Sequence, residues 1–318
     1  MPDTNFTPRP PLAAAKFRDP DVTAKGEPRA SVEMAGLRTL WFNTGSLCNI
    51  ACDNCYIESS PTNDRLAYLS ASEVRGYLDE VAGAGWPVEE IGFTGGEPFL
   101  NRELTEMLAE ALARGYRVIV LTNAMKPMQR YRDRLLALSD HAAALTFRVS
   151  LDHYERGGHE QVRGAGTWAP AMAGLRWLAD NGFSIAVAGR ALWPEREDEL
   201  REGFARLFAT ERLPVDAFDP ARLVLFPEMD GHLDVPEITT GCWDILGVEP
   251  STMMCASSRM IIKRKNAPAP AVVPCTLLPY DPAFELGTSL ADALRPVKLN
   301  HPFCAQFCVL GGASCSAS

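Results

Sequence analysis

Short apolar segments and amphipathic segments follow one another along the chain and predict strands and helices in alternation. Residues 118–121 form a continuous apolar run, which is typical of a strand covered on both faces. Ser70 and Glu73 have the spacing of a capping box at a helix start, and the apolar residues after them recur at helical period. The expected strands are 37–42, 90–94, 118–121, 145–151, 184–191 and 222–226. The expected helices are one that begins after Ser70, three at about 104–112, 128–138 and 168–181, and one that precedes the strand at 222.

Strands that alternate with helices imply parallel strands joined by right-handed crossovers. The strand–helix units are more numerous than in a minimal dinucleotide-binding fold and fewer than in an eight-stranded barrel. The expected fold class is therefore α/β, with a partial (β/α)6 TIM-like barrel over residues 31–236. In such barrels the chemistry lies at the carboxyl ends of the strands. Residues 1–30 are expected to form a poorly ordered arm. Residues 237–318 are expected to form a small cysteine-rich domain, which follows the turn-rich stretch 227–236 and contains a hairpin loop at 263–270.

The charge balance excludes one class of partner. The chain has 318 residues, with 31 Lys and Arg against 40 Asp and Glu, and its net charge of −9 argues against a nucleic acid bound through a general basic surface. No run approaches the roughly 18 apolar residues of a membrane-spanning helix, so no membrane partner is expected. Residues 1–28 are polar, are rich in proline and lack the apolar core of a signal peptide, so the expected location is the cytoplasm.

The cysteines fall into two groups. Nine are present, and none lies between Cys55 and Cys242. The first group, Cys48, Cys52 and Cys55, has CxxxCxxC spacing, and soft thiolate ligands at such spacing favour an iron–sulfur cluster or zinc. Three thiolates on a four-iron cluster leave one iron open to an outside ligand, whereas a zinc knuckle would need a fourth ligand such as Asp53.

A glycine-rich strand end follows the first cysteine group. The expected strand 90–94 runs into the sequence Thr94-Gly95-Gly96-Glu97-Pro98. Glycine has no Cβ, so backbone at these positions can approach a ligand closely. Together with the cysteine triad, this segment resembles the radical S-adenosylmethionine (radical SAM) superfamily. The resemblance implies that the triad holds a 4Fe-4S cluster, and that the strand end at Gly95 and Gly96 receives the ammonium group of S-adenosylmethionine (SAM), with Glu97 supporting it.

Further strand ends supply candidate SAM ligands. Ser150 and Asp152 end the fourth expected strand, and alternation places both on one face. The resemblance implies that a polar residue here meets the SAM ribose or carboxylate, with a helix N-cap or turn as the alternative. Arg163 and Arg190 are both candidates for a charge-assisted fork to the SAM carboxylate, with a surface or structural role as the alternative for each. Asn123, at the end of the third strand, is also a candidate SAM ligand, with a surface or structural role as the alternative. No catalytic side chain beyond the cluster ligands is expected.

The second cysteine group lies in the expected C-terminal domain. The segment from Cys275 to Gly287, together with the late cysteines, resembles the auxiliary-cluster extensions called SPASM and twitch. A cysteine pair that flanks a hairpin, followed by a close pair, matches a single twitch-like cluster. Cys242 is expected to be a buried small apolar residue instead. The expected ligands of an auxiliary 4Fe-4S cluster are four of Cys255, Cys275, Cys304, Cys308 and Cys315, with the first four preferred, and a structural zinc site is the alternative.

The resemblance implies an enzyme. The reduced cluster would cleave SAM to methionine and a 5′-deoxyadenosyl radical, which would take a hydrogen from a substrate held over the barrel mouth. An auxiliary cluster would take the electron back or anchor the substrate. A flavodoxin- or ferredoxin-like electron donor is implied, and similar extensions occur in enzymes that act on peptides or on small molecules, so both substrate classes stay open. The alternative from a different class is a non-catalytic iron–sulfur or zinc-binding protein on the same scaffold.

Overall fold

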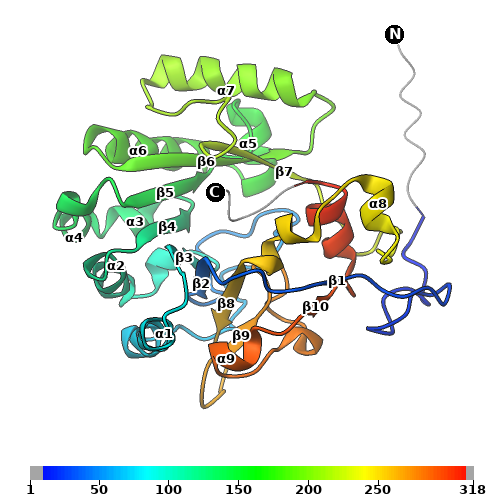
Figure 1. Ribbon diagram of the computed structural model, residues 1–318. Helices are drawn as coiled ribbons and strands as arrows, with labels where there is room; N and C mark the ends of the chain where they lie inside the picture. The colour runs from blue at the N-terminus through cyan, green and yellow to red at the C-terminus, as the bar shows by residue number, and fades with distance from the viewer. Residues whose placement is uncertain (1–9, 313–318) are drawn as a thin grey trace, which may run out of the picture.

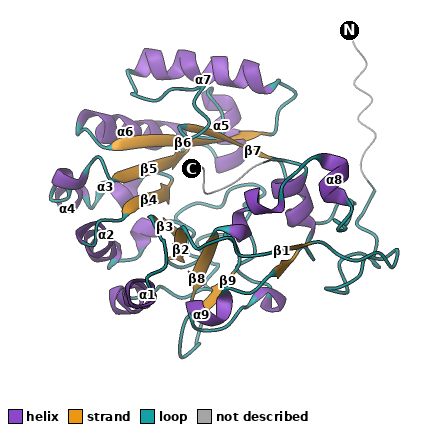
Figure 2. Cartoon of the chain, viewed as in Figure 1, coloured by secondary structure: helices purple, strands orange, loops and turns teal. Residues whose placement is uncertain are grey.

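One large sheet organises the chain (Figures 1 and 2). The structure, a computed structural model, describes residues 10–312. The sheet has eight strands in the order β7-β6-β5-β4-β3-β2-β8-β9, and every neighbouring pair is parallel except β8 and β9. Its strands are β2 (Thr39–Asn43), β3 (Glu90–Thr94), β4 (Arg117–Thr122), β5 (Leu145–Ser150), β6 (Ser184–Ala191), β7 (Leu223–Pro227), β8 (Ser258–Ile262) and β9 (Ala271–Val273). A separate two-stranded sheet pairs β1 (Ser31–Val32) with β10 (Val297–Lys298).

The strands β2 to β7 form the partial barrel. They lie side by side in chain order, and one or two helices precede each next strand, so the expected α/β fold class with a partial (β/α)6 barrel is confirmed. The capping box of the first helix is also confirmed, because Ser70 and Glu73 bond reciprocally. The helices are α1 (Ala71–Ala84), α2 (Leu104–Ala113), α3 (Lys126–Gln129), α4 (Arg132–Leu136), α5 (Arg156–Arg163), α6 (Trp168–Asp180), α7 (Glu197–Glu211), α8 (Cys242–Leu246) and α9 (Leu290–Ala293).

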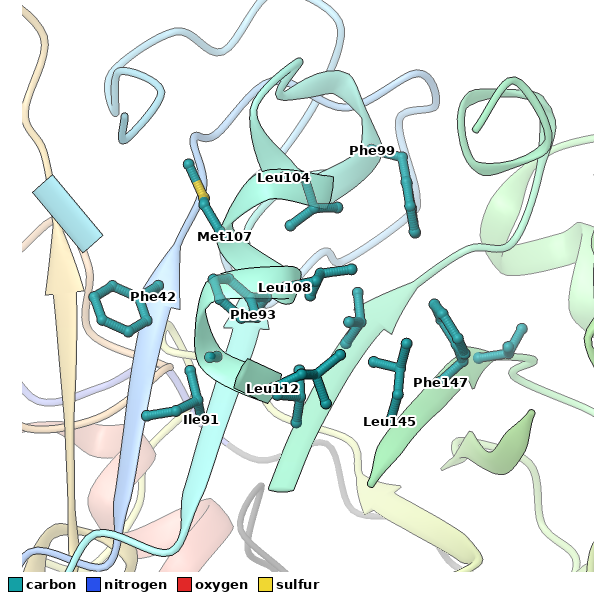
Figure 3. Close-up of a cluster of buried hydrophobic side chains, with 14 of the residues drawn as sticks. Phe42, Ile91, Phe93, Phe99, Leu104, Met107, Leu108, Leu112, Leu145 and Phe147 are labelled. Atoms are coloured by element: carbon teal, nitrogen blue, oxygen red, sulfur yellow. The ribbon is translucent and has the colours of Figure 1, made fainter. Parts of the chain in front are cut away.

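Each face of the sheet has its own apolar core. Leu40 and Phe42 of β2 belong to the core beneath the helices, whereas Trp41 between them belongs to a second core that includes much of the C-terminal region. The period of two along a strand explains this division. Figure 3 shows the first core, where α2 packs over the strands. The residues labelled there are Phe42, Ile91, Phe93, Phe99, Leu104, Met107, Leu108, Leu112, Leu145 and Phe147.

The C-terminal strands extend the barrel sheet. Strand β8 pairs with β2 in parallel, with Thr39 opposite Ser258, and β9 returns antiparallel to β8 after the expected hairpin loop. Strand β2 therefore lies in the middle of the sheet, between β3 and β8. A domain division near residue 236 remains a prediction, since the hydrogen-bonded sheet continues across it.

Two helical segments differ from the sequence expectation. The helix expected at 128–138 is divided into α3 and α4, because Tyr131 leaves helical geometry and its ring packs on Phe99 with 5.9 Å between ring centroids. Helix α5 was not expected, since its sequence contains two glycines and only one aliphatic residue, Val162. It matters for the site because its last residue is Arg163.

Residues 10–30 also differ from the poorly ordered arm expected for residues 1–30. They lie along the segment 232–239, and the Arg29 guanidinium donates a buried hydrogen bond to Glu237 at 2.6 Å. Glu237 also accepts the backbone N–H groups of Phe17 and Ala24. One buried carboxylate therefore fixes three points of this N-terminal segment, a tertiary contact that local composition does not reveal.

Candidate functional site

A cavity of about 180 Å³ lies at the carboxyl ends of the barrel strands. The first cysteine group and most of the expected SAM ligands line it, although they come from six separate segments of the chain. The expected residues that line the cavity are Cys48, Cys52, Cys55, Gly95, Gly96, Asn123, Ser150, Asp152, Arg163 and Arg190. Glu97 is the expected residue that does not.

The cysteine loop follows β2 and is fixed from two sides. The backbone N–H of Cys48 donates to the Ser60 carbonyl at 3.0 Å, and that of Asp53 donates to Val162 of α5 at 2.7 Å. Burial raises the pKa of the Cys48 thiol to about 12. Burial also raises the pKa of Cys52, although the positive charge of Arg163 opposes this. Because thiolates and not thiols ligate iron, cluster binding at this loop would release protons.

The glycine pair serves chain packing as well as the cavity. A Cβ on Gly95, which has φ of 138°, would lie 2.5 Å from the Gly45 carbonyl oxygen. A Cβ on Gly96 would lie 2.2 Å from the carbonyl oxygen of Leu47. The sequence predicts that these glycines allow close approach of a ligand. The structure adds that they let β3 pass against the backbone that carries Cys48.

Glu97 lies beneath the cavity and joins two strand ends. Its carboxylate accepts hydrogen bonds from the Thr122 hydroxyl at 2.9 Å, from the backbone N–H of Asn123 at 2.9 Å and from that of Phe99 at 3.1 Å. Burial raises its pKa to about 7, against the lowering effect of these three donors. The carboxylate therefore fixes the end of β3 to the end of β4, and its support of the SAM ammonium stays a prediction.

Asn123 connects this strand end to the cysteine loop. Its side-chain Nδ2 donates to Asn49 Oδ1 at 2.9 Å and lies 4.0 Å from the Cys48 sulfur. Its Oδ1 accepts the backbone N–H of Met125 at 3.0 Å. The side chain thus orients the loop next to a candidate cluster ligand.

Both candidate arginines already have a carboxylate partner. Asp152 accepts two hydrogen bonds from Arg163, and both residues line the cavity. Arg190 donates to Glu228 and to the Asp53 carbonyl, and its buried Nε has no partner within the part of the chain that the structure describes. Glu228 was missed because it follows β7 in a turn-rich stretch, where no local pattern distinguishes it from a surface carboxylate.

Tyr56 closes the wall beside the cysteine loop. The Arg190 guanidinium lies 5.0 Å from the centre of its ring, and its hydroxyl donates to the Pro227 carbonyl at 2.7 Å. Its ring also meets Phe226 edge-on, with 6.4 Å between centroids. Tyr56 therefore packs beside the cysteine loop and keeps its hydroxyl within the protein.

The preferred cysteines of the second group converge on a second cavity of about 30 Å³. Cys304 and Cys308 stand on a π-helix (Cys304–Val309), and burial raises the pKa of the Cys255 thiol to about 11. Leu277 lines both cavities, so the two sites adjoin. The cysteines at this cavity are Cys255, Cys275, Cys304 and Cys308.

Two other cysteines stand apart. Cys242 lines neither cavity, and its sulfur accepts the backbone N–H of Thr239 at 3.3 Å. Cys315, the alternative ligand, lies outside the described residues. Within residues 10–312, no three His, Cys, Asp or Glu side chains are close enough to hold a single metal ion. No helix in the same range has both the length and the apolar character to cross a membrane.

Comparison with known proteins agrees with the geometry. Residues 42–208 match the family model described as the radical SAM superfamily. The antilisterial bacteriocin subtilosin biosynthesis protein AlbA of Bacillus subtilis is 28% identical over 192 residues, which are 58% of this chain and 41% of AlbA. The GTP 3′,8-cyclase of Rhodococcus opacus is 30% identical over 181 residues, which are 54% of this chain and 50% of the cyclase. The matches thus span half or less of these relatives' own lengths.

Solved structures share the fold at low sequence identity. The structure of anSMEcpe with bound AdoMet superimposes with a TM-score of 0.57 at 12% identity, over 83% of this chain and 78% of that chain. Streptococcus suis SuiB bound to S-adenosylmethionine gives a TM-score of 0.54 at 12% identity, over 76% of this chain and 60% of SuiB. The family match covers more than half of the sequence and contains both the cysteine triad and the glycine pair, so this chain belongs to the radical SAM superfamily.

Proposed function

We propose that this protein is a radical SAM enzyme that binds a 4Fe-4S cluster through Cys48, Cys52 and Cys55 and cleaves SAM reductively. The observation that carries the proposal is the convergence of this triad with Gly95, Gly96 and the polar ends of β4, β5 and β6 on one cavity. A cluster held by Cys48, Cys52 and Cys55 would supply one electron for the reductive cleavage of SAM to methionine and 5′-deoxyadenosine.

The chain's own residues fix the cysteine loop and place charges on the cavity wall. The hydrogen bonds of Cys48 and Asp53 fix the cysteine loop, and Asn123 orients it from the barrel side. The Asp152–Arg163 pair places two fixed opposite charges on the cavity wall, where the polar groups of SAM would bind. Such positioning matters because a carbon radical attacks the nearest suitable bond.

We further propose that Cys255, Cys275, Cys304 and Cys308 hold an auxiliary 4Fe-4S cluster. Four cysteines on one small cavity provide a closed set of soft ligands, in contrast to the three of the first site. The shared wall residue Leu277 supports a role for this second site in the same reaction, either to accept an electron or to anchor substrate.

The substrate and the electron donor belong to the same proposal. AlbA is named for the biosynthesis of a bacteriocin and the Rhodococcus protein for the cyclisation of GTP, so both a peptide-modifying and a small-molecule reaction have a precedent among the relatives. We propose a substrate from one of these two classes and a flavodoxin- or ferredoxin-like donor, with the protein acting in the cytoplasm.

Iron and sulfide content after anaerobic reconstitution tests both cluster assignments. We expect about eight irons per wild-type chain, and about four in a variant with Cys48, Cys52 and Cys55 all changed to alanine. Changing the four cysteines of the second cavity to alanine should also leave about four. Cys242→Ala is the matched control and should keep about eight, because Cys242 lines neither cavity.

The outcomes separate enzyme from non-enzyme. Wild-type protein with dithionite and SAM should release 5′-deoxyadenosine, and the triple variant should release none. Iron content that the triple variant leaves unchanged would refute the first site. Zinc in place of iron at the second cysteine set would refute the auxiliary cluster while leaving the first assignment intact.

A further inference from the structure

The first cavity has a polar half and an apolar half. The polar half contains the glycine pair and the ends of β4 and β5, with Asn123, Asp152 and Arg163. The apolar half contains Tyr56, Leu121, Phe226 and Leu277, all of which belong to or pack against the apolar core around the second cysteine set. The cavity therefore changes from polar to apolar toward the second site.

Polar groups near the apolar half are engaged within the protein. The Tyr56 hydroxyl donates to Pro227, and Asn54 donates to Glu228 and to the Met229 carbonyl. The Thr276 hydroxyl lies 3.9 Å from the sulfur of Met254. Arg190, whose guanidinium lies 5.0 Å from the centre of the Tyr56 ring, donates to Glu228 and to the Asp53 carbonyl, and it forms the charged edge of this half. The side chains of Leu121, Phe226 and Leu277 present hydrocarbon surface, and hydrocarbon surface binds other hydrocarbon.

We propose that the apolar half of this cavity binds a hydrocarbon group of the substrate, either an aliphatic or an aromatic side group, and presents its C–H bonds to the polar half. The inference rests on the proposed function, since the polar half is assigned to SAM. The rival occupant of the apolar half is the adenine ring of SAM itself, and the two occupants predict opposite effects of a substitution there.

The test compares two probes of nearly equal shape, N-acetyl-leucine amide and N-acetyl-asparagine amide, with deuterated side chains. Saturation-transfer NMR on the reconstituted protein with SAM should detect the leucine probe and not the asparagine probe. With dithionite present, deuterium should appear in 5′-deoxyadenosine only from the leucine probe. In that step the probe C–D bond breaks, the C5′–D bond forms, and dithionite with a solvent proton reduces the carbon radical left on the probe.

Leu277→Asn should reduce the deuterium transfer roughly tenfold, because it places an unpaired amide in the apolar half. Leu277→Met should retain the deuterium transfer. Leu246→Asn, at an exposed position of α8, is the surface control and should also retain it. The SAM dissociation constant of Leu277→Asn, measured by equilibrium dialysis, should stay within about twofold of wild type. A pentapeptide with the same deuterated leucine between glycines distinguishes a peptide substrate from a small-molecule substrate. Deuterium transfer from the pentapeptide, without transfer from the single-residue probe, would assign the hydrocarbon group to a peptide.

Two results would overturn the proposal. A tenfold loss of SAM affinity in Leu277→Asn would assign the apolar half to adenine. Equal NMR signals and equal label from both probes would show that the apolar half does not select hydrocarbon. Failure of the proposed function is distinguishable, because wild-type protein would then produce no 5′-deoxyadenosine even without a probe.

A second inference concerns a buried cation beside the second cysteine set. Arg259 of β8 has no exposed surface, and its guanidinium donates only to backbone carbonyls, namely those of Cys255 at 2.6 Å, Ser258 at 2.7 Å, Ala293 at 2.7 Å and Arg295 at 3.0 Å. Among residues 10–312, no carboxylate lies within ion-pair distance of it. A buried charge without an opposite charge is costly.

We infer that Arg259 is the counter-charge of the anionic group that the second cysteine set binds. The guanidinium donates to the backbone carbonyl of Cys255, one of the four cysteines, so the cation lies directly beside this set. Four thiolates around a 4Fe-4S core carry net negative charge, and net charge is one determinant of the cluster's reduction potential. This inference rests on the proposed auxiliary cluster.

Redox titration followed by electron paramagnetic resonance tests the counter-charge. Arg259→Met should lower the midpoint potential of the second cluster by at least 59 mV, which is a tenfold change for one electron, while Arg259→Lys should stay closer to wild type. Arg38→Met, at an exposed arginine, is the control. Equal shifts of the midpoint potential in Arg259→Met and Arg259→Lys would indicate that Arg259 has only a structural role. An unchanged midpoint potential in an Arg259→Met protein that retains its iron would refute the inference. Absence of a second cluster in wild type would refute the proposed function instead.

Discussion

At the scale of single residues, the site depends on contacts that the sequence shows only in part. Gly95 and Gly96 could be chosen from sequence because a glycine pair at a strand end after a cysteine triad is unusual. The packing of these glycines against Gly45 and Leu47 could not be predicted from the sequence, because those contacts come from the adjacent loop. The motif indicates the position of Glu97, but it does not show that the carboxylate accepts hydrogen bonds from Thr122 and from the backbone N–H of Asn123. A motif identifies a position, whereas the side-chain direction depends on neighbouring strands.

Gly96→Ala should displace the cysteine loop, because the added Cβ would lie 2.2 Å from a backbone oxygen that cannot yield cheaply. We expect a loss of about 1–3 kcal/mol in the free energy of unfolding and reduced iron at the first site. Urea denaturation and iron analysis check this. Gly83→Ala in α1 is the control, since nothing lies within 4 Å of its Cβ position, and it should keep full iron and gain stability. Full iron in Gly96→Ala would contradict the packing argument.

His159 should make the fold sensitive to acid. It is fully buried on α5 with neither ring nitrogen bonded among the described residues, and burial lowers its pKa to about 4 from 6.5. Between pH 6.5 and 4 the unfolded chain binds a proton that the folded chain does not, so stability should fall as pH decreases, by up to about 3 kcal/mol.

His159→Phe should remove this dependence and keep the ring contact with Trp168. Unfolding free energies at pH 4.5 and pH 7 measure the effect, and the same substitution at exposed His141 serves as control. An unchanged pH slope in His159→Phe would show that other groups cause the acid sensitivity.

At the scale of elements, periodicity predicted most strands and failed where tertiary contacts decide. The strands of the barrel are short apolar runs, so their sequence pattern and their burial agree. Helix α5 is polar with two glycines, and tertiary contacts support it: the Val162 carbonyl accepts the backbone N–H of Asp53, and the buried His159 ring meets Trp168. The π-helix at Cys304–Val309 has no sequence pattern of its own, and its Gln306 bonds the distant Asp230.

Gln306 should hold this π-helix in place. Its amide donates to the Asp230 carbonyl at 2.8 Å and accepts the Asp230 backbone N–H at 2.9 Å. Gln306→Leu leaves both backbone groups without these partners, and we expect a loss of about 2–4 kcal/mol in unfolding free energy and weaker iron retention at the second site. Chelator challenge of the reconstituted protein measures retention. Retention equal to wild type would show that the cysteine set does not depend on this clamp.

At the scale of the whole molecule, the C-terminal region contributes both to the barrel sheet and to the first cavity. Strand β8 and Leu277 come from the C-terminal region, yet one pairs with β2 and the other lines the first cavity. The sequence could separate two cysteine groups, but it could not place them on adjoining cavities, because that depends on which strand β8 joins. The segment 10–30 likewise shows its role only through its distant contact at Glu237.

Arg29→Met should release the N-terminal segment. It removes a buried cation and leaves the Glu237 carboxylate, whose side chain is 5% exposed, without its charge partner. The expected cost is about 3–5 kcal/mol. Hydrogen–deuterium exchange should rise across residues 10–30. Lys16→Met, which removes a more exposed ion pair to Asp234, should have a small effect, and equal exchange in both variants would contradict the special role of Glu237.

The central place of β2 has a consequence for biosynthesis. Cys48, Cys52 and Cys55 leave the ribosome early, while β8 and Leu277 emerge much later, so the nascent chain presents the cysteine loop beside an incomplete sheet and an open cavity. We therefore expect iron to be delivered to the first site most readily before β8 and Leu277 take their places beside it. Ribosome-bound chains stalled before residue 258 should accept a cluster faster than the finished apoprotein, and equal rates would show that the folded cavity already admits the delivery machinery.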